Sequence, residues 1–193
     1  MILVDMNQVT ISNLMMQVGS KRQNDVDENL VRHMVLNSLR MYRAKFFEEF
    51  GELVLCYDNK RYWRRDYFPN YKSNRKKDRA NSGLDWNLIF ETLNTIRDEI
   101  RENFPYKVIE VDGAEADDCI AILTKELLKD PNNRIKIITS DTDYLQLYND
   151  CNCKLIDKKN GIHNLKIYNL KNKNNLVNVD KFIMKKDLKD LIN

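Results

Sequence analysis

Four short apolar runs, each with acidic residues just beyond it, constrain the fold of this chain more than any other feature. Runs of this kind are typical of β-strands. The carboxyl ends of parallel strands share one edge of an open sheet and form a crevice there, so we expect the acids to converge at that edge. The runs are Ile2–Val4, Leu53–Tyr57, Val108–Val111 and Ile135–Thr139, and the acids are Asp5, Asp58, Glu115, Asp117, Asp118, Asp141 and Asp143.

Helical patterns lie between these runs. Asp27–Phe50 repeats apolar residues with i, i+3, i+4 spacing, and Gly51 follows at a favourable C-cap position. Asp85 can cap a second helix, and a third covers Glu115–Lys129. The second helix has an apolar stripe of Leu88, Ile89, Leu93, Ile96 and Ile100. Helices that alternate with strands predict an α/β fold, a three-layer α/β/α sandwich around a central, mainly parallel sheet with right-handed crossovers.

Composition bounds the class of protein. The 193 residues are 42% hydrophobic and 32% charged, which suits a globular domain rather than a disordered chain. No apolar run approaches a membrane span and the N-terminus lacks a signal-peptide pattern, so we expect a cytoplasmic protein with no membrane partner. The four cysteines lack paired CxxC spacing, and only His33 and His163 could assist them, so we expect reduced thiols and no zinc site.

The last part of the chain gives a weaker signal. We expect a core domain over residues 1–155 and a C-terminal extension over residues 156–193, which is rich in Lys and Asn. Short strands are predicted at Lys154–Asp157 and His163–Tyr168, and a final helix at Val179–Leu191. The Lys and Asn content fits a biased genome as well as it fits a nucleic-acid surface.

The acidic clusters predict a metal site. So many like charges cannot all stay ionised at one edge without a counter-charge, and hard divalent cations bound through oxygen are the usual solution. Each cluster also has a simpler reading. Glu115–Asp118 could stabilise a helix N-terminus, Asp141 and Asp143 could be an N-cap with a first-turn acid, and Asp5 or Asp58 could be turn residues. Their shared position beyond the strands favours Mg²⁺ or Mn²⁺.

A basic, aromatic segment interrupts the pattern. Lys60–Gly83 contains nine Lys or Arg and two Asp, about +7 in a chain whose net charge is +3. Five aromatic residues are interleaved with these cations. The combination suits single-stranded nucleic acid, because cations follow the phosphates while rings stack on bases. A solvated charged loop, the alternative, would not usually carry five aromatics. A basic segment beside an acidic pocket suggests a polyanion drawn to a metal centre.

Seven stretches of the first 150 residues carry a more specific pattern: Leu3–Asp5, Val31–His33, Leu55–Asn59, Tyr62–Asp66, Tyr71–Arg75, Glu115–Asp118 and Ser140–Asp143. In residue type and order they resemble the metal-dependent 5′-nucleases. This family includes flap endonucleases, the 5′-nuclease domain of bacterial DNA polymerase I and phage exonucleases. The likeness is strongest to the ribonuclease H of T-even bacteriophages.

The resemblance implies a PIN-like 5′-nuclease core that holds two divalent ions, Mg²⁺ or Mn²⁺. One set of acids would bind the first ion, and a second pair would span it and the second ion. Asp118 is the adjacent acid of the same motif. The first set is Asp5, Asp58, Glu115 and Asp117, and the spanning pair is Asp141 and Asp143.

The resemblance also identifies Lys60–Gly83 as a helical arch, or clamp. Within it, Lys72 and Arg75 would neutralise charge on the phosphate oxygens in the transition state. Together with Asp141 and Asp143 they form the predicted catalytic set. The predicted nucleic-acid contacts are Arg64, Arg65, Tyr71, Lys72, Arg75, Lys76 and Lys77.

The implied reaction is Mg²⁺-dependent hydrolysis of phosphodiesters at the 5′ ends of RNA primers or DNA during replication or repair. It would be a 5′-3′ exonuclease, flap endonuclease or ribonuclease H-type activity. The partners would be DNA and RNA–DNA duplexes with 5′ ends or flaps, together with a single-strand-binding protein, a clamp or a polymerase. The sequence leaves open the preference for RNA or DNA and for exonuclease or endonuclease cleavage.

One departure supports an alternative. The family continues into a helix–three-turn–helix that binds duplex and supplies acids to the second ion. Asp187 and Asp190 have the DxxD spacing of those acids, but Lys186 stands where the family has glycine. The alternative is therefore a truncated or split DNA-binding nuclease that cuts poorly without a partner chain. A haloacid-dehalogenase-like phosphatase is disfavoured, because Asn7 replaces the acid expected two residues after Asp5.

Overall fold

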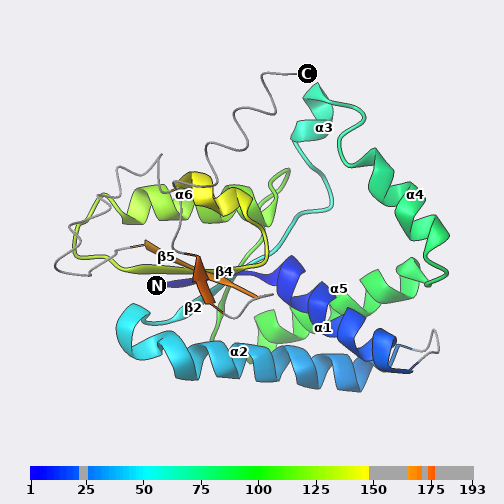
Figure 1. Ribbon diagram of the computed structural model, residues 1–193, viewed down its shortest axis with the longest axis horizontal. Coiled ribbons are helices and arrows are strands. Elements are labelled where there is room, and N and C mark those ends of the chain that lie inside the picture. Colours follow the sequence, from blue (N-terminus) through cyan, green and yellow to red (C-terminus); the bar gives the residue numbers. More distant parts are fainter. Residues whose placement is uncertain (22–25, 148–164, 171–173, 177–193) are drawn as a thin grey trace.

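A mainly parallel sheet forms the centre of the protein (Figure 1). The computed structural model describes residues 1–21, 26–147, 165–170 and 174–176. The strand order is β3-β2-β1-β4-β5-β6, and every pairing is parallel except that of β5 with β6. The strands are β1 (Ile2–Asp5), β2 (Leu53–Cys56), β3 (Lys107–Ile109), β4 (Ile135–Thr139), β5 (Leu165–Asn169) and β6 (Asn174–Leu176). The predicted α/β architecture is confirmed, and the first four strands lie where the apolar runs predicted them.

Helices cover both faces of the sheet, which gives the predicted three layers (Figure 1). The helices α1 (Met6–Lys21), α2 (Glu28–Phe50) and α5 (Trp86–Asn103) lie on one face, and α6 (Ala116–Leu127) lies on the other. Side chains alternate along a strand, so Val4 packs with the first group of helices while Leu3 packs with α6.

The helix ends follow the capping residues in the sequence. The Asp27 carboxylate accepts the Leu30 N–H at 3.1 Å to start α2, and Gly51 ends that helix with φ of 80°. The Asp85 carboxylate accepts two N–H groups at the start of α5. The apolar stripe of α5 is predicted correctly except at Leu88, which is 42% exposed. The two free cysteines that the structure describes, Cys56 and Cys119, are both buried.

Helix α1 has no counterpart among the predicted elements. It begins at Met6, directly after β1, and its inner face is partly polar. Thr10, Asn13 and Gln17 are all buried, at 3%, 8% and 2% exposure. The Thr10 hydroxyl donates to Met6 O, and the Asn13 amide donates to Val9 O. Because three of its buried positions are polar, apolar periodicity alone does not reveal this helix.

The topology places the functional edge at β1. The chain runs from β1 outward to β2 and β3, then crosses to β4 and β5 on the other side of β1. Ligands of open α/β sheets bind outside the carboxyl ends of the strands at such a switch point. Asp5 is the last residue of β1, and Asp58 follows the end of β2 by two residues.

The predicted arch stands apart from the layered core (Figure 1). It contains two short helices, α3 (Arg64–Tyr67) and α4 (Ser73–Asn81), and neither of these fully described helices has a buried residue. Lys72 precedes α4 in the left-handed conformation, with φ of 56°. The arch therefore takes its position from polar contacts rather than from a hydrophobic core of its own.

Few of the C-terminal predictions can be compared with the structure. The strand predicted at His163–Tyr168 is confirmed in part as β5. The predicted strand at Lys154–Asp157, the predicted helix at Val179–Leu191 and the acids Asp187 and Asp190 lie outside the described residues. Within the described ranges, no helix has the length and apolar character needed to cross a membrane.

Candidate metal centre and nucleic-acid interface

A cavity of about 490 Å³ opens at the carboxyl edge of the sheet, a volume suited to ligand binding. Its lining comes from three parts of the chain. Carboxylates come from the sheet edge and α6, cations come from the arch, and both polar and apolar side chains come from α1 and α5. The carboxylates are Asp5, Asp58, Glu115, Asp117 and Asp141, and the arch cations are Lys60, Arg65, Lys72, Arg75 and Arg79.

Asp5 lies deepest in the carboxylate group of the sheet edge. It is 6% exposed and accepts hydrogen bonds from the Tyr144 hydroxyl at 3.2 Å, the Thr139 hydroxyl at 3.3 Å and the Gln8 N–H at 3.3 Å. Burial raises its pKa to about 7, the Gln8 N–H opposes that rise, and the charge of Asp58 adds to it. The fold thus holds a carboxyl group whose charge needs a counter-ion.

Asp58 and Glu115 belong to one local arrangement. The Asp58 carboxylate accepts the N–H of Ala116, the first residue of α6, at 2.7 Å. Burial raises the pKa of Asp58, and the charge of Glu115 adds to that rise. Glu115, the N-cap residue of α6, is 1% exposed. The start of α6 therefore fixes two of the predicted metal ligands relative to each other.

Asp117 and Asp118 share the first turn of α6 but have different surroundings. Asp117 lines the cavity, and burial raises its pKa. Asp118 accepts the Glu115 N–H at 3.0 Å and bonds to both Arg64 and the Trp63 indole N–H. Burial opposes ionisation of Asp118, but the bonds from Arg64 and from Glu115 outweigh it and lower the pKa. Asp118 therefore joins arch to helix, while Asp117 faces the cavity.

Of the acids Asp141 and Asp143, only Asp141 lies at the predicted centre. Asp141 lines the cavity, and its carboxylate also accepts the Asp143 N–H at 2.9 Å. Asp143 is exposed at the start of a 3₁₀ turn (Asp143–Gln146), and the described residues that line the cavity do not include it. The simpler reading of this motif, an N-cap with a first-turn acid, holds in part, because Asp143 is the first-turn acid while the N-cap residue is Thr142.

The donor set fits a hard divalent cation. Oxygen atoms of Glu115, Asp117 and Asp118 lie within 4.8 Å of one another. Carboxylate oxygens are the ligands that Mg²⁺ and Mn²⁺ prefer. Burial raises the pKa of Asp5, Asp58 and Asp117, which disfavours their ionised forms unless a cation lies beside them. Both observations support a cation site at this edge.

The arch meets the carboxylates at Glu115. The Glu115 carboxylate accepts from Arg64 at 2.7 Å and from the Tyr71 hydroxyl at 2.9 Å, and it forms an ion pair with Lys72. Arg64 continues to Asp118 through two further contacts at 2.7 and 2.8 Å. The positive segment is thereby held over the acidic edge, as the charge pattern predicts.

The remaining predicted arch residues divide into two groups. Arg65 and Arg75 line the cavity, and the Arg65 guanidinium lies over the Tyr62 ring at 5.0 Å. Lys76 and Lys77 are exposed on α4 and lie outside the described cavity lining. The structure therefore places Arg65 and Arg75 beside the predicted centre, and the two lysines on the outer surface of the arch.

Sequence reasoning did not single out the cavity wall formed by α1 and α5. Residues of α5 at i, i+3, i+4 and i+7 spacing line it, next to the buried stripe of the same helix. The spacing of these residues could have indicated a second functional face of α5. It cannot be distinguished in the sequence from ordinary amphipathic periodicity. The lining residues outside the predicted site set are Asn7, Gln8, Thr10, Ile11, Tyr57, Asn59, Lys60, Tyr62, Arg79, Phe90, Leu93, Asn94 and Arg97.

Comparison with known proteins identifies the family. Residues 1–179 match the family model described as "5′-3′ exonuclease, N-terminal resolvase-like domain". This chain belongs to the 5′-3′ exonuclease family. Its membership confirms the resemblance to the 5′-nucleases. Ribonuclease H of Enterobacteria phage T4, also a nuclease, is 37% identical to it over 156 residues, which are 79% of this chain and 50% of that protein. The chain thus spans half the length of this curated relative.

Solved structures show the same fold in this family. A crystal structure of a phage T5 5′-exonuclease with bound zinc has a TM-score of 0.60 at 16% identity, covering 91% of this chain and 56% of that one. A phage T5 flap endonuclease complex with DNA and metal ions has a TM-score of 0.59 at 16% identity, covering 90% and 56%. At such identities the likeness establishes the fold, and the roles of individual residues depend on the geometry of this chain.

Proposed function

We propose that this chain is the nuclease core of a Mg²⁺- or Mn²⁺-dependent 5′-nuclease. It would hydrolyse phosphodiesters at the 5′ ends of RNA primers or DNA, as a 5′-3′ exonuclease or flap endonuclease. The observation that carries the proposal is one cavity with buried carboxylates on one side and the cationic arch on the other. Enzymatic hydrolysis of a nucleic-acid phosphodiester uses both features, because the acids bind cations and the arch attracts the nucleic-acid chain.

The proposed ion ligands are the acids of the cavity. Asp5, Asp58, Glu115 and Asp117 would hold the first ion, and Asp141 would lie between it and a second ion. Asp118 and Asp143 remain proposed members of the acidic set, with Asp118 acting through its bonds to Arg64. Bound divalent ions at this position would supply an activated water and neutralise charge on the phosphate.

The proposed work of the arch is to bind and orient the strand. Lys72 and Arg75 lie on the cavity side of the arch, where they can pair with the non-bridging oxygens of the phosphate. Arg64, Arg65 and Tyr71 would position the neighbouring nucleotides, while Lys76 and Lys77 would attract more distant phosphates. We also propose that the core extends over residues 1–155, with the arch at 60–83.

The substrates and partners are proposed from the relatives. The phage T4 relative is a ribonuclease H, and a T5 structural relative is a flap endonuclease complexed with DNA. RNA–DNA hybrids and DNA with 5′ flaps are therefore the proposed substrates. A single-strand-binding protein, a clamp or a polymerase would be its partner at a replication site.

A cleavage assay tests the proposal. Labelled 5′-flap DNA and an RNA–DNA hybrid are incubated with Mg²⁺ and the wild-type chain, Asp141→Asn or the matched control Asp130→Asn, whose acid lies in the turn after α6. The wild type and the control should release short 5′ products, and Asp141→Asn should cut at least about a hundredfold more slowly. Equal binding without cleavage by all three proteins would contradict the proposal that the chain is an enzyme by itself.

A further inference from the structure

The cavity has a second wall, away from the carboxylates, that the proposed chemistry does not use. Ile11 of α1 and Phe90 and Leu93 of α5 contribute apolar side chains to it. All three are intermediate in burial, so they lie at the surface of the cavity. Polar side chains border this apolar patch, among them Asn94 and Arg97. A small apolar surface with a few polar groups at its margin is typical of a ligand site.

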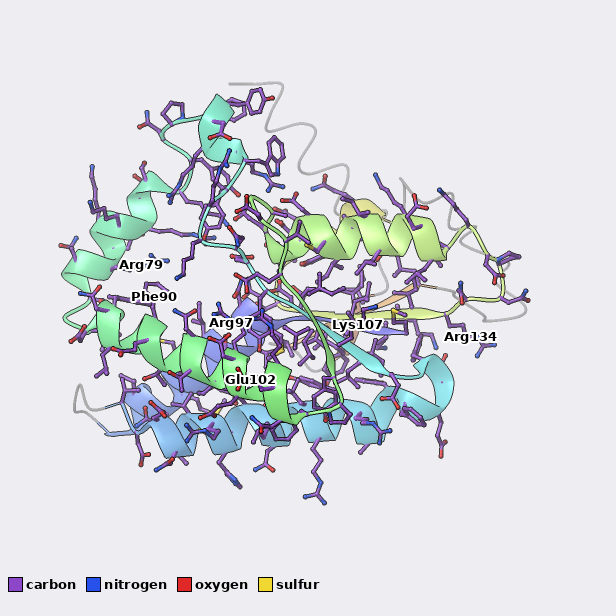
Figure 2. All side chains as sticks on the ribbon, turned by 180° about the vertical axis from the view of Figure 1, so that it is seen from behind. Arg79, Phe90, Arg97, Glu102, Lys107 and Arg134 are labelled. Carbon is purple, nitrogen blue, oxygen red and sulfur yellow. The ribbon has the colours of Figure 1, made fainter. Side chains whose placement is uncertain are left out.

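An arginine and two aromatic rings close the outer end of this wall. The Arg79 guanidinium lies 4.7 Å from the centre of the Phe90 ring and 5.2 Å from that of Trp86. Figure 2 shows Arg79 and Phe90 facing each other in the angle between α4 and α5, with Arg97 farther along α5. Arg79 and Phe90 both line the cavity, so the patch is continuous with the arch.

Tyr57 adds a buried polar group to the same wall. It is 5% exposed, lines the cavity, and its hydroxyl has no hydrogen-bond partner among the described residues. Burial raises the pKa of this hydroxyl, so it remains a donor at neutral pH. A buried donor without a partner is destabilising, and a polar group brought against this wall can relieve that cost.

The chemistry of this wall fits an unpaired nucleobase. A base offers a flat apolar face to Phe90, Leu93 and Ile11 and polar edges to the margin, and its own phosphate can pair with Arg79. In a duplex both faces of a base are covered by its neighbours, so only a single-stranded nucleotide presents a free face. The cationic arch on the same cavity supplies the charge complementarity.

We propose that Phe90, with Ile11 and Leu93, forms a stacking subsite for one unpaired base of the strand whose phosphate reaches the carboxylates. The subsite rests on the proposed nuclease function, because the strand enters the cavity for cleavage. It makes the enzyme sensitive to the base at one position of the 5′ single strand. A nucleotide that lacks a base at that position binds more weakly, although its phosphate charge is unchanged.

A cycle of protein and substrate changes tests this subsite. Fluorescein-labelled 5′-flap DNAs carry a single abasic site at successive flap positions, and their affinities are measured by anisotropy with Ca²⁺ in place of Mg²⁺. The proteins are the wild type, Phe90→Ala, Ile11→Ala and the control Phe104→Ala, whose ring is exposed beyond the end of the same helix. Thermal denaturation checks that each variant is folded.

One abasic position should weaken binding to the wild type roughly tenfold. The same position should have little further effect on Phe90→Ala, because the stacking ring is already absent, and a reduced effect on Ile11→Ala, which keeps the ring but loses an apolar neighbour. Phe104→Ala should behave as the wild type. If Phe90 only joined α4 to α5 through Arg79, Phe90→Ala would weaken all substrates by one common factor. That result, or an abasic scan without effect on the wild type, would overturn the subsite.

The failure of the proposed function would look different. If the chain binds the flap with the predicted dependence on Phe90 but releases no product with Mg²⁺, the stacking subsite is supported and the proposed nuclease function is contradicted. If the chain cuts the flap with Mg²⁺ but its affinity depends neither on the flap base nor on the Phe90 ring, the nuclease function is supported and the stacking subsite is contradicted.

Discussion

The carboxylate edge and the arch face the same cavity, but they are held in place by different forces. Asp5 and Glu115 are 6% and 1% exposed and extend from a strand and a helix that belong to the hydrophobic core. The arch helices α3 and α4 contain no buried residue along their described lengths. The arch contacts Glu115 through the charged side chains of Arg64 and Lys72 and through the Tyr71 hydroxyl.

This difference indicates a division of labour. The core fixes the acids independently of any ligand, which suits a site that must keep several carboxylates at defined spacing. The arch is held by ion pairs that a bound strand can replace with phosphate contacts. We therefore expect the core to set the chemistry and the arch to adapt to the substrate.

Glu115 is the residue at which the two regions meet, so its substitution should have the largest effect. Glu115→Gln removes a proposed ion ligand and weakens the hold on Arg64 and Lys72. Cleavage should fall about a thousandfold or more, and trypsin should cut residues 60–83 faster than in the wild type. A matched change at an exposed acid, Glu126→Gln on the far end of α6, should alter neither readout. Unchanged cleavage by Glu115→Gln would mean that the carboxylate edge and the arch do not both depend on Glu115.

Substitution of Asp5 can measure how much the ionised carboxylate at the sheet edge lowers the free energy of unfolding. Its pKa of about 7 in the folded state is above the ordinary value of 3.8 for an aspartate, so the folded state binds the proton more tightly than the unfolded state. The contribution of Asp5 to stability is therefore greatest at low pH, and it falls as pH rises from about 4 to 7.

In EDTA at pH 8, Asp5→Asn should be more stable than the wild type by up to about 4 kcal/mol, and the gap should close near pH 4. Urea denaturation at several pH values measures this gap. A wild type that is as stable as Asp5→Asn at pH 8 would show that the carboxylate is already compensated.

Within the arch, Lys72 and Lys76 provide a matched pair. Lys72 faces the cavity and Lys76 is exposed outside it. Lys72→Ala should lower kcat about a hundredfold with a smaller change in binding, because we propose that its ammonium group neutralises charge in the transition state. Lys76→Ala should mainly lower affinity and reduce the salt dependence by about one ion. Single-turnover rates at saturating substrate separate the two, and equal rates for Lys72→Ala and wild type would exclude the catalytic role.

The first four strands and the helices α2, α5 and α6 could be predicted because their local signals agree with the tertiary structure. The runs at β1, β2 and β4 are buried on both sides, and Asp85 and Gly51 cap the helices that they were expected to cap. Helix α1 could not be predicted in the same way. Its buried positions include Asn13 and Gln17, and the hydrogen bond from the Asn13 amide to Ser38 of α2 depends on packing that a sequence does not show.

The candidate site was predictable at the level of residue type and strand position, and less so at the level of partners. The convergence of Asp5, Asp58, Glu115 and Asp117 follows from strand order at the carboxyl edge. The contact of Asp118 with Arg64 depends on where the arch lies relative to α6, a long-range arrangement that spacing does not determine.

Metal binding tests the central claim most directly, since the carboxylate edge is proposed to be a divalent-cation centre. Electron paramagnetic resonance can count bound Mn²⁺ in the wild type, Asp58→Asn and the control Asp130→Asn at pH 8. The wild type and the control should bind Mn²⁺ at this centre, Mg²⁺ should compete for it, and Asp58→Asn should bind at least about tenfold more weakly. Equal Mn²⁺ binding by all three proteins would contradict the account.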